Sequence, residues 1–216
     1  NMIELYTSAT PNGKKISIAL EELALPYRVH RIDISKGDQH SAEFTRLNPN
    51  QKIPVIVDTD TGMTVAESGA SLLYLADKTG QLIPVEKEGY WAVVQWLMWQ
   101  KAGFGPMLGQ AHHFIKFNPG KSEYAEHRYG KETERLYGVL DRQLSKGGYI
   151  VGGDYSIADI AAWPWAARHS FQGIDLNDFP NVLAWYLEIA ARPAVRAGWA
   201  VPIPEEVPMP RGFDDD

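Results

Sequence analysis

The sequence predicts an α/β domain followed by an all-helical domain, because the hydrophobic period changes along the chain. Over the first eighty residues, short strand-like apolar runs alternate with segments of helical spacing, whereas only helical spacing recurs after residue 89. A proline-containing segment without a clear period separates the two regions. We therefore expect domains over residues 1–82 and 89–200, a linker over 83–88 and a Pro-rich acidic tail over 201–216.

The first domain is predicted to have the element order β-α-β-α-β-β-α, which combines a parallel crossover with a terminal hairpin. Strands are expected at residues 2–6, 27–33, 55–58 and 63–66. Helices are expected at residues 14–23, in a short segment that ends before Asn48-Pro49, and at 68–78 before Gly80. Turn residues at 10–13 and 60–62 separate these elements and support the assignment.

The second domain shows the 3.6-residue period of packed helices. Helices are expected at about residues 90–103, 124–146, 157–168 and 181–192, with Gly105-Pro106 interrupting the first and Pro193 stopping the last. Ser156 and Asp159 are spaced as the N-cap and N3 residues of a capping box. The helix that follows is apolar on nearly all sides, so we expect it to be central, buried and important for folding rather than chemistry. Beyond Val201 there is no period, and we expect an extended or disordered tail.

Composition and charge exclude several classes of function. The chain of 216 residues has a formal net charge of −6 and a pI near 5.5, whereas a nucleic-acid partner requires a basic face. No segment has the roughly 20 consecutive apolar residues of a membrane-spanning helix. The first five residues lack the basic and apolar regions of a signal peptide. We therefore expect a cytoplasmic protein that binds neither nucleic acid nor membrane.

The chain contains no cysteine, which excludes disulfides, thiolate metal sites and protein thiol nucleophiles. Any thiol chemistry has to be supplied by a ligand. The pair His112-His113 does not predict a metal site, because adjacent helical residues point about 100° apart and no further ligand stands at suitable spacing. We expect no metal, and a structural or pocket-lining role for these histidines.

Two helix starts in the first domain carry polar side chains that suit an anionic ligand. Thr10 and Asn12 flank Pro11 at the start of the first helix, and Glu67-Ser68 stand at the start of the helix over 68–78. Unpaired N–H groups and the helix dipole favour a thiolate or a carboxylate at such positions. From the residues alone, ordinary N-capping is the preferred interpretation of Thr10 and Asn12, and it is equally open for Glu67-Ser68.

The segment Lys52-Ile53-Pro54 precedes a short strand and permits two interpretations. A trans edge-strand proline is the one that sequence alone favours. A cis bond would instead turn the backbone sharply and present the N–H and C=O groups of Ile53 outward.

These segments together resemble the glutathione transferase superfamily over about residues 2–200. Four features in register carry the resemblance: the order of elements, the Ile53-Pro54 step, Glu67-Ser68 at a helix start, and the Ser156-to-Asp159 box. Each feature is weak alone, and their combination is strong. The resemblance implies a thioredoxin-like first domain with a cis Pro54, followed by the all-helical domain of the glutathione transferase fold.

A narrower resemblance is to the nu class and its fungal nitrogen-regulator-like relatives. The segments that carry it are residues 6–13, 48–54, 105–114 and 155–165. That group acts mainly as glutathione-dependent disulfide reductases, often with peroxidase activity. The resemblance therefore implies a homodimeric enzyme that uses reduced or oxidised glutathione and acts on a small-molecule disulfide or hydroperoxide.

The resemblance also implies roles for particular residues. Thr10 and Asn12 are the expected catalytic residues, because they are placed to stabilise the glutathione thiolate. The expected glutathione-binding residues are Gln39, Lys52, Ile53, Pro54, Glu67, Ser68 and Arg128. The expected wall of the second-substrate pocket consists of Phe104, Met107, His113 and Trp165.

Within this set, Glu67 is expected to hold the amino group of the γ-glutamyl end, and Ser68 its carboxylate. Arg128 resembles a residue that crosses a dimer interface toward the partner's ligand. Plain surface roles stay open for Gln39, Lys52 and Arg128, and core roles for the apolar wall. Many glutathione transferases use a strand-end tyrosine, but the spacing of Tyr6 from Pro11 favours a core position.

We predict an enzyme that reduces disulfides with a glutathione thiolate, with organic hydroperoxide reduction as a companion activity. Conjugation of electrophiles and a non-catalytic glutathione-binding regulatory module are the alternatives. The presence of Thr10, Asn12, Glu67 and Ser68 together favours the enzyme, because a scaffold would not need all four.

Overall fold

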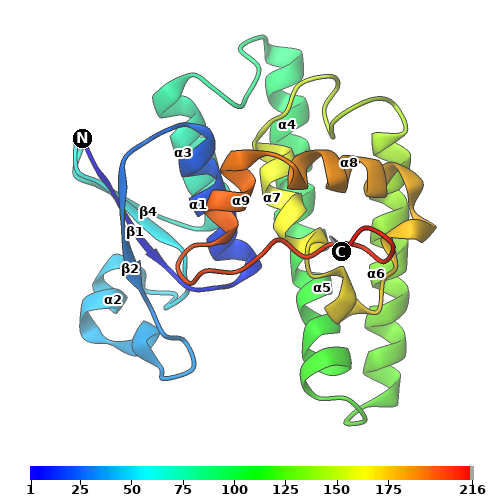
Figure 1. Cartoon of the computed structure of the whole chain (residues 1–216). Coiled ribbons are helices and arrows are strands. Elements are labelled where there is room, and N and C mark those ends of the chain that lie inside the picture. The colour runs from blue at the N-terminus through cyan, green and yellow to red at the C-terminus, as the bar shows by residue number, and fades with distance from the viewer. Residues whose placement is uncertain (215–216) are drawn as a thin grey trace. The chain divides into compact units, whose positions relative to one another are not determined.

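The computed structural model describes residues 1–214, which divide by their contacts into two compact units (Figure 1). Unit 1 comprises Asn1–Gln81 and Arg192–Glu206, and unit 2 comprises Leu82–Ala191 and, among the described residues, 207–214. Among the helices of these 214 residues, none combines the length and the apolarity that a bilayer crossing requires.

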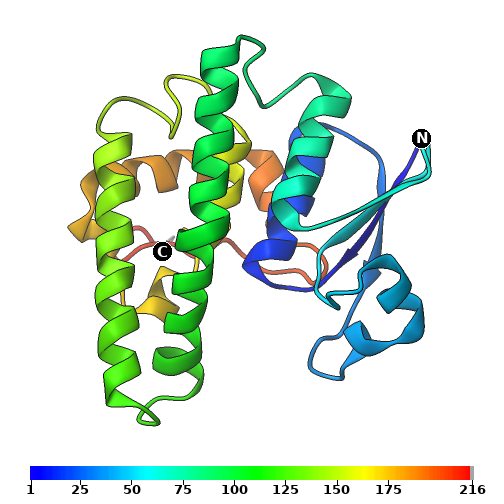
Figure 2. The same ribbon diagram turned by 180° about the vertical axis from the view of Figure 1, so that it is seen from behind.

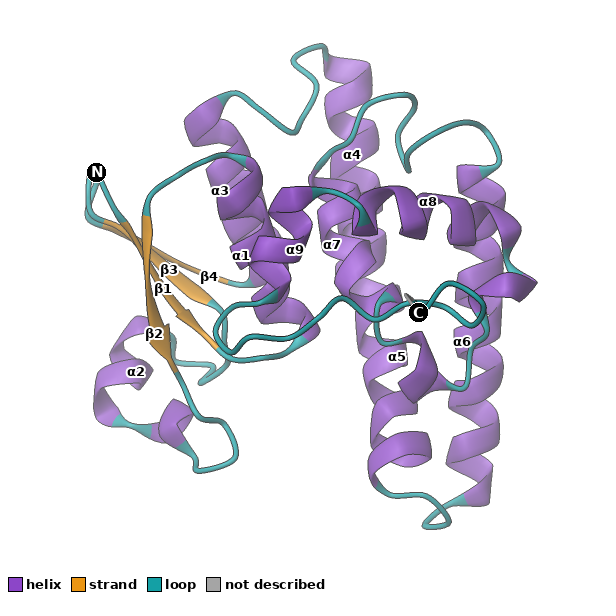
Figure 3. Ribbon diagram, viewed as in Figure 1, coloured by secondary structure: helices purple, strands orange, loops and turns teal. Residues whose placement is uncertain are grey.

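Unit 1 is built on a four-stranded sheet in the order β2-β1-β3-β4 (Figure 3). Its strands are β1 (Ile3–Thr7), β2 (Tyr27–Arg31), β3 (Val55–Asp58) and β4 (Met63–Ala66). β1 pairs in parallel with β2 and antiparallel with β3, which pairs antiparallel with β4. The predicted crossover and terminal hairpin are therefore confirmed.

Helices cover both faces of this sheet. They are α1 (Pro11–Glu22), α2 (Ala42–Leu47) and α3 (Ser68–Thr79), with a short 3₁₀ turn at Asp38–His40. α1 and α3 lie on one side of the sheet and α2 lies on the other (Figures 1 and 3). Gly80 ends α3 in a left-handed conformation with φ 66°, which glycine adopts more readily than residues with a Cβ.

A further helix of unit 1, α9 (Pro193–Trp199), was not predicted. The preceding helix, α8 (Pro180–Ala190), ends before Pro193 as predicted, and Pro193 also occupies the first turn of α9, where proline is favoured. α9 packs against α1 so closely that a Cβ at Gly198 would lie 2.5 Å from the Ile18 Cα. The predicted domain bounds placed this segment in the helical domain, whereas its contacts place it in unit 1.

Unit 2 consists of helices and their connections, shown from behind in Figure 2. The helices are α4 (Lys87–Trp99), α5 (Gly105–Ala111), α6 (Glu123–Leu144), α7 (Ile157–Ala166) and α8 (Pro180–Ala190). The predicted interruption at Gly105-Pro106 is wrong, because a π-helical turn at Gln100–Phe104 joins α4 to α5. The Gly105 N–H reaches back to the Gln100 C=O, and Pro106 lies in the first turn of α5.

The capping box predicted at the start of α7 is confirmed. The Asp159 carboxylate accepts a hydrogen bond from the Ser156 N–H at 2.9 Å, and the Ser156 hydroxyl accepts one from Ala158 at 3.2 Å. Asp159 also accepts from the Ile150 N–H at 3.0 Å and from the Trp185 indole at 2.9 Å. Burial nevertheless raises the pKa of Asp159 to about 6. All ten residues of α7 are buried, as expected for the central helix.

The tail is extended, and specific contacts fix it. Trp199 donates its indole N–H to the Glu206 C=O at 3.1 Å within unit 1. Within unit 2, Arg211 forms an ion pair with Asp175 at 2.7 Å. Asp215 and Asp216, which belong to the predicted tail, lie outside the described residues.

Candidate functional site

The start of α1 carries the two predicted catalytic residues, Thr10 and Asn12. Thr10 is the N-cap, with extended backbone, and its hydroxyl accepts a hydrogen bond from the Gly13 N–H at 3.2 Å. A residue with a Cβ does not fit at position 13 in place of Gly13, because the added atom would overlap the Ser8 carbonyl oxygen and the Thr7 hydroxyl. The loop after β1 therefore folds closely over the helix start. The capping interpretation of Thr10 is confirmed. Because the Thr10 oxygen accepts this hydrogen bond, its hydroxyl hydrogen points away from the helix.

The Ile53–Pro54 peptide bond is cis, as the resemblance implied. Within residues 1–214, no hydrogen bond to the Ile53 N–H or C=O is found. Both groups therefore suit an extended peptide that adds alongside this segment.

The sheet register brings three predicted site segments to one end of the sheet. Val55, which follows Pro54, pairs with Tyr6 near the end of β1 and with Ala66 at the end of β4. The loop toward Thr10 leaves from the end of β1, and Glu67 directly follows Ala66. The start of α1, the Ile53–Pro54 step and the start of α3 consequently meet at this end. A ligand placed there encounters two helix N-termini, both of which favour negative charge.

The start of α3 has an unusual backbone. Glu67 precedes the helix with φ 70° and ψ 120°, a conformation that non-glycine residues rarely adopt and that costs ~1–3 kcal/mol. Ser68 is buried, and its hydroxyl oxygen accepts a hydrogen bond from the Lys15 ammonium at 3.2 Å. The sequence identified the Glu67-Ser68 pair, but the strained backbone and the contact with Lys15 appear only in the structure.

Gln39 and Lys52 lie on neighbouring loops of unit 1. His40 Nδ1 lies 2.8 Å from Gln51 Oε1, which ties the 3₁₀ turn to the segment before Pro54. The Lys52 side chain is exposed, and its C=O accepts from Asn48 at 2.8 Å. Gln39 Oε1 is buried without a hydrogen-bond partner among the described residues, whereas its Nε2 donates to the Ile34 C=O at 3.5 Å.

Tyr6 is partly exposed and does not belong to the buried core, so the predicted core position is wrong. Its ring stacks on His30 at a centroid distance of 4.4 Å and contacts Phe44 of α2 at 6.4 Å. Burial raises the pKa of Tyr6, and the charges of Glu4 and Glu43 raise it further. Because α2 lies on the face of the sheet opposite α1, the Tyr6 ring faces away from α1.

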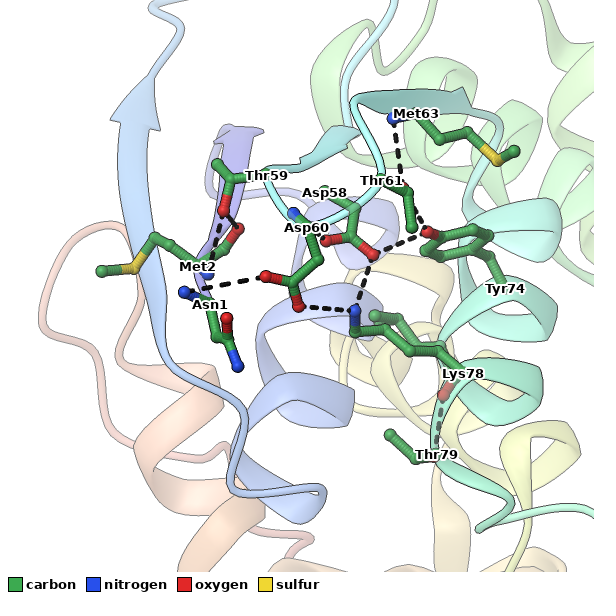
Figure 4. Close-up of polar contacts among 11 residues, drawn as sticks. Asn1, Met2, Asp58, Thr59, Asp60, Thr61, Met63, Tyr74, Lys78 and Thr79 are labelled. Atoms are coloured by element: carbon green, nitrogen blue, oxygen red, sulfur yellow. Dashed lines mark hydrogen bonds and ion pairs between the residues drawn. The ribbon is translucent and has the colours of Figure 1, made fainter.

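A network at the other end of α3 was missed by the sequence analysis (Figure 4). Asp58 is buried at the end of β3, where it accepts hydrogen bonds from the Tyr74 hydroxyl at 2.6 Å and the Lys78 ammonium at 2.8 Å. Burial opposes ionisation of Asp58, but these hydrogen bonds outweigh it and lower the pKa of the carboxyl. The network anchors the C-terminal part of α3 to the β3–β4 hairpin.

The four residues expected to form a second-substrate wall in unit 2 differ in how far they are exposed. Phe104 is fully buried and packs between the rings of Trp99 at 5.0 Å and Tyr137 at 5.4 Å. His113 is exposed, Met107 is half-buried and Trp165 is buried. Phe104 is therefore a core residue of unit 2, whereas His113 faces solvent.

His112, rather than His113, is the histidine that contacts Trp165, at a ring distance of 5.3 Å. The Gln172 amide lies 2.9 Å from His112 Nε2 and donates to the Trp165 C=O at 2.9 Å. Because that amide is a donor, His112 Nε2 accepts and the ring is neutral. Burial, assisted by the charge of Arg168, lowers the pKa of His112 to about 4.

A concave pocket of ≈ 560 Å³ lies between α5 and α6. Its lining residues are Met107, Tyr124, His127, Arg128, Tyr129, Lys131, Glu132 and Arg135. Met107 and Arg128, which the sequence analysis gave separate roles, thus face the same pocket. Glu132 and Arg135 form a bidentate ion pair there, in which Arg135 Nη2 and Nε donate to the two Glu132 carboxylate oxygens at 2.7 and 2.9 Å. Within residues 1–214, no group of three or more His, Asp and Glu side chains is arranged to hold a metal ion.

Comparison with known proteins finds relatives of both units. Residues 2–77 match the family model of the glutathione S-transferase N-terminal domain, and residues 104–193 match that of the C-terminal domain. The disulfide-bond oxidoreductase YfcG of Escherichia coli is 49% identical over 198 residues, which cover 89% of this chain and 92% of that protein.

Solved structures show the same arrangement of elements. A glutathione transferase from Burkholderia graminis, solved with two glutathione molecules per subunit, has a TM-score of 0.88 and 43% identity, covering 93% of this chain and 88% of that one. A glutathione transferase from Pseudomonas putida, solved with one glutathione disulfide per subunit, has a TM-score of 0.89 and 40% identity, covering 93% and 92%. The predicted fold class, a thioredoxin-like domain followed by an all-helical domain, is thereby confirmed.

Proposed function

Because the chain belongs to the glutathione S-transferase family, we propose that it is an enzyme that reduces disulfide bonds with glutathione as co-substrate. The observation that carries the proposal is the meeting of the α1 start, the Ile53–Pro54 step and the Glu67-Ser68 pair at one end of the sheet. The name of the relative YfcG supports the reaction, and the glutathione and glutathione disulfide in the solved neighbours support the ligand.

In this proposal each segment meets one part of the tripeptide. Glu67 and Ser68 hold the amino and carboxylate groups of the γ-glutamyl end, and the Ile53 backbone pairs with the cysteinyl unit. Gln39 and Lys52 reach the glycyl carboxylate from the neighbouring loops. The sulfur then lies at the start of α1, where Thr10, Asn12 and the helix N–H groups stabilise the thiolate and raise its fraction at neutral pH.

The reaction needs two glutathione molecules for each substrate disulfide. The first thiolate attacks one substrate sulfur, so a mixed disulfide forms and the departing substrate thiolate takes up a proton. A second glutathione thiolate attacks the glutathione sulfur of the mixed disulfide and releases the second substrate thiol. Two glutathiones are thereby oxidised to one glutathione disulfide, while one substrate disulfide is reduced to two thiols. The chain has no cysteine, so no protein thiol takes part.

The same thiolate supports reduction of organic hydroperoxides. It attacks a peroxide oxygen, the O–O bond breaks to release an alcohol, and the sulfenic acid of glutathione condenses with a second glutathione to give the disulfide and water. Conjugation of electrophiles is the weaker alternative, because a site shaped for a second glutathione leaves less room for them.

We further propose that the protein is a homodimer in which Arg128 reaches the partner's ligand. Arg128 is exposed on α6 and lines the pocket between α5 and α6, where its charge is accessible to an anionic group. Light scattering is expected to show twice the chain mass of 24.2 kDa. A monomer with full activity would contradict this part of the proposal.

A steady-state assay with glutathione and a small organic disulfide tests the reaction. We expect glutathione-dependent release of thiol, slower turnover with an electrophilic aryl halide, and some turnover with an organic hydroperoxide. Glutathione binding without turnover on any of these substrates would indicate the non-catalytic module instead. Absence of glutathione binding would contradict the proposal as a whole.

A further inference from the structure

Helix α1 carries two consecutive lysines, Lys14 and Lys15, whose side chains are both 0% exposed. An ammonium group removed from water is costly unless it is paired and hydrogen-bonded. Two such groups directly after a predicted catalytic segment therefore call for specific partners. The sequence pattern shows only that both residues belong to a helix.

Lys14 is bound by the C-terminal part of unit 1. Its ammonium lies 3.1 Å from the Glu205 carboxylate and donates to the backbone C=O of Trp199. It also lies 4.5 Å from the centre of the Trp199 ring. Lys14 thus ties α1 to α9 and the residues after it, which is a structural role.

Lys15 faces a different partner, because adjacent helical residues point about 100° apart. Its ammonium donates to Ser68 Oγ at 3.2 Å, across a separation of 53 residues in the sequence. An ammonium has only donors, so the Ser68 oxygen accepts and the Ser68 hydroxyl hydrogen is directed away from Lys15. Ser68 is itself buried at the first position of α3, where the helix dipole favours an anion.

We propose that Lys15 is a positioning residue for the γ-glutamyl carboxylate of glutathione and that it acts through Ser68. This inference rests on the proposed function. Lys15 holds the Ser68 hydroxyl in the orientation that donates to the carboxylate, and its buried charge favours an anion at that position. The site therefore discriminates ligands by the charge at the γ-glutamyl end, independently of the thiol chemistry at the start of α1.

The test compares how three proteins bind glutathione and an analogue whose γ-glutamyl α-carboxylate is amidated. Affinities are measured by titration calorimetry, and KM and kcat by the steady-state disulfide reductase assay. The wild-type protein is expected to bind glutathione about tenfold or more tightly than the amide. Lys15→Met is expected to lose that preference and to raise KM for glutathione about tenfold, with kcat at saturation within about twofold of wild type. Lys14→Met is the matched control, equally buried one residue away, and is expected to lower stability while the preference persists.

The possible outcomes distinguish failure of the proposed function from failure of the inference about Lys15. Wild-type protein that does not bind glutathione would contradict the proposed function itself. Wild-type protein that binds both ligands equally would overturn the inference alone, as would a Lys15→Met variant with the full preference. Should Lys15→Met not fold, Lys15→Gln keeps a donor for Ser68 without the charge. Its preference is expected to fall, and full retention would overturn the inference.

Discussion

Three predicted site segments of unit 1 meet at one end of the sheet, whereas the four residues predicted as the second-substrate wall in unit 2 differ widely in exposure. In unit 1 they follow the ends of strands, and the pairing of Val55 with Tyr6 and Ala66 places those ends side by side. In unit 2 they lie on helices, where Phe104 turns into the core and His113 toward solvent. Residues at strand ends are thus placed by the topology of the sheet, whereas residues on helices are placed by rotation about each helix axis.

The largest expected effect tests whether Phe104 belongs to the core. Phe104→Ala removes a ring packed between two others, so we expect a loss of ~3–5 kcal/mol in the free energy of unfolding, measured by urea denaturation. The exposed neighbour of the same predicted set, His113→Ala, is expected to change it by less than about 0.5 kcal/mol. A Phe104→Ala variant of normal stability with an altered KM for the disulfide would restore the pocket assignment.

Asn12→Ala tests the site at the start of α1. We expect turnover to fall ~10²–10³-fold, more than glutathione binding weakens, because this donor matters most where negative charge sits on sulfur. Thr10→Ala is expected to be milder, since the helix N–H groups share the task. Full disulfide reductase activity in both variants and in the double variant would show that the thiolate is stabilised elsewhere.

His112 links pH to the stability of unit 2. Its pKa is about 4 in the folded chain and 6.5 without the surrounding structure, so the unfolded chain binds the proton first. Neutral His112 therefore contributes to the free energy of unfolding in full above pH 6.5. This contribution, on the order of 3 kcal/mol in total, is lost as the pH falls toward 4.

Denaturation of wild type and His112→Gln across this range checks the effect. The difference between the two proteins should shrink as pH falls, because glutamine keeps an acceptor for Gln172 but does not titrate. Asp159, whose pKa is raised to about 6 by burial, has the opposite effect on stability but is common to both proteins. A difference that stays constant with pH would contradict the assignment.

Glu67→Ala tests ligand binding at the strained start of α3. Removing the carboxylate is expected to weaken glutathione binding by ~1–3 kcal/mol, measured by isothermal titration. Asp77→Ala, an exposed acidic residue on the same helix, is the control and should bind normally. Unchanged affinity in Glu67→Ala would remove this residue from the site.

The last prediction is that a thiol-alkylating reagent does not change the activity. Treatment with a thiol-alkylating reagent, followed by its removal, should leave the activity intact because the chain has no cysteine. A parallel sample of a cysteine-dependent reductase should be inactivated under the same conditions. Loss of activity here would show that another side chain reacts within the site.

Much of the candidate site was predictable because its signals are local. Thr10, Glu67 and Ser68 stand at helix starts that capping residues and proline mark in the sequence. The cis form of the Ile53–Pro54 bond came from the resemblance, since the residues alone favoured trans. Lys15 could not be found in this way, because a lysine on a helix is ordinarily exposed and nothing nearby indicates its burial.

The sequence by itself determined the bounds of β3 and β4, the capping box at Ser156 and the absence of cysteine from this chain. Only the tertiary structure decided that α9 joins unit 1, that a π-helical turn carries α4 into α5, and that Lys15 meets Ser68. Periodicity and caps act over a few residues, and the sequence therefore shows them directly. Burial of a charge depends on a partner 53 residues away, and only the folded chain brings the two together.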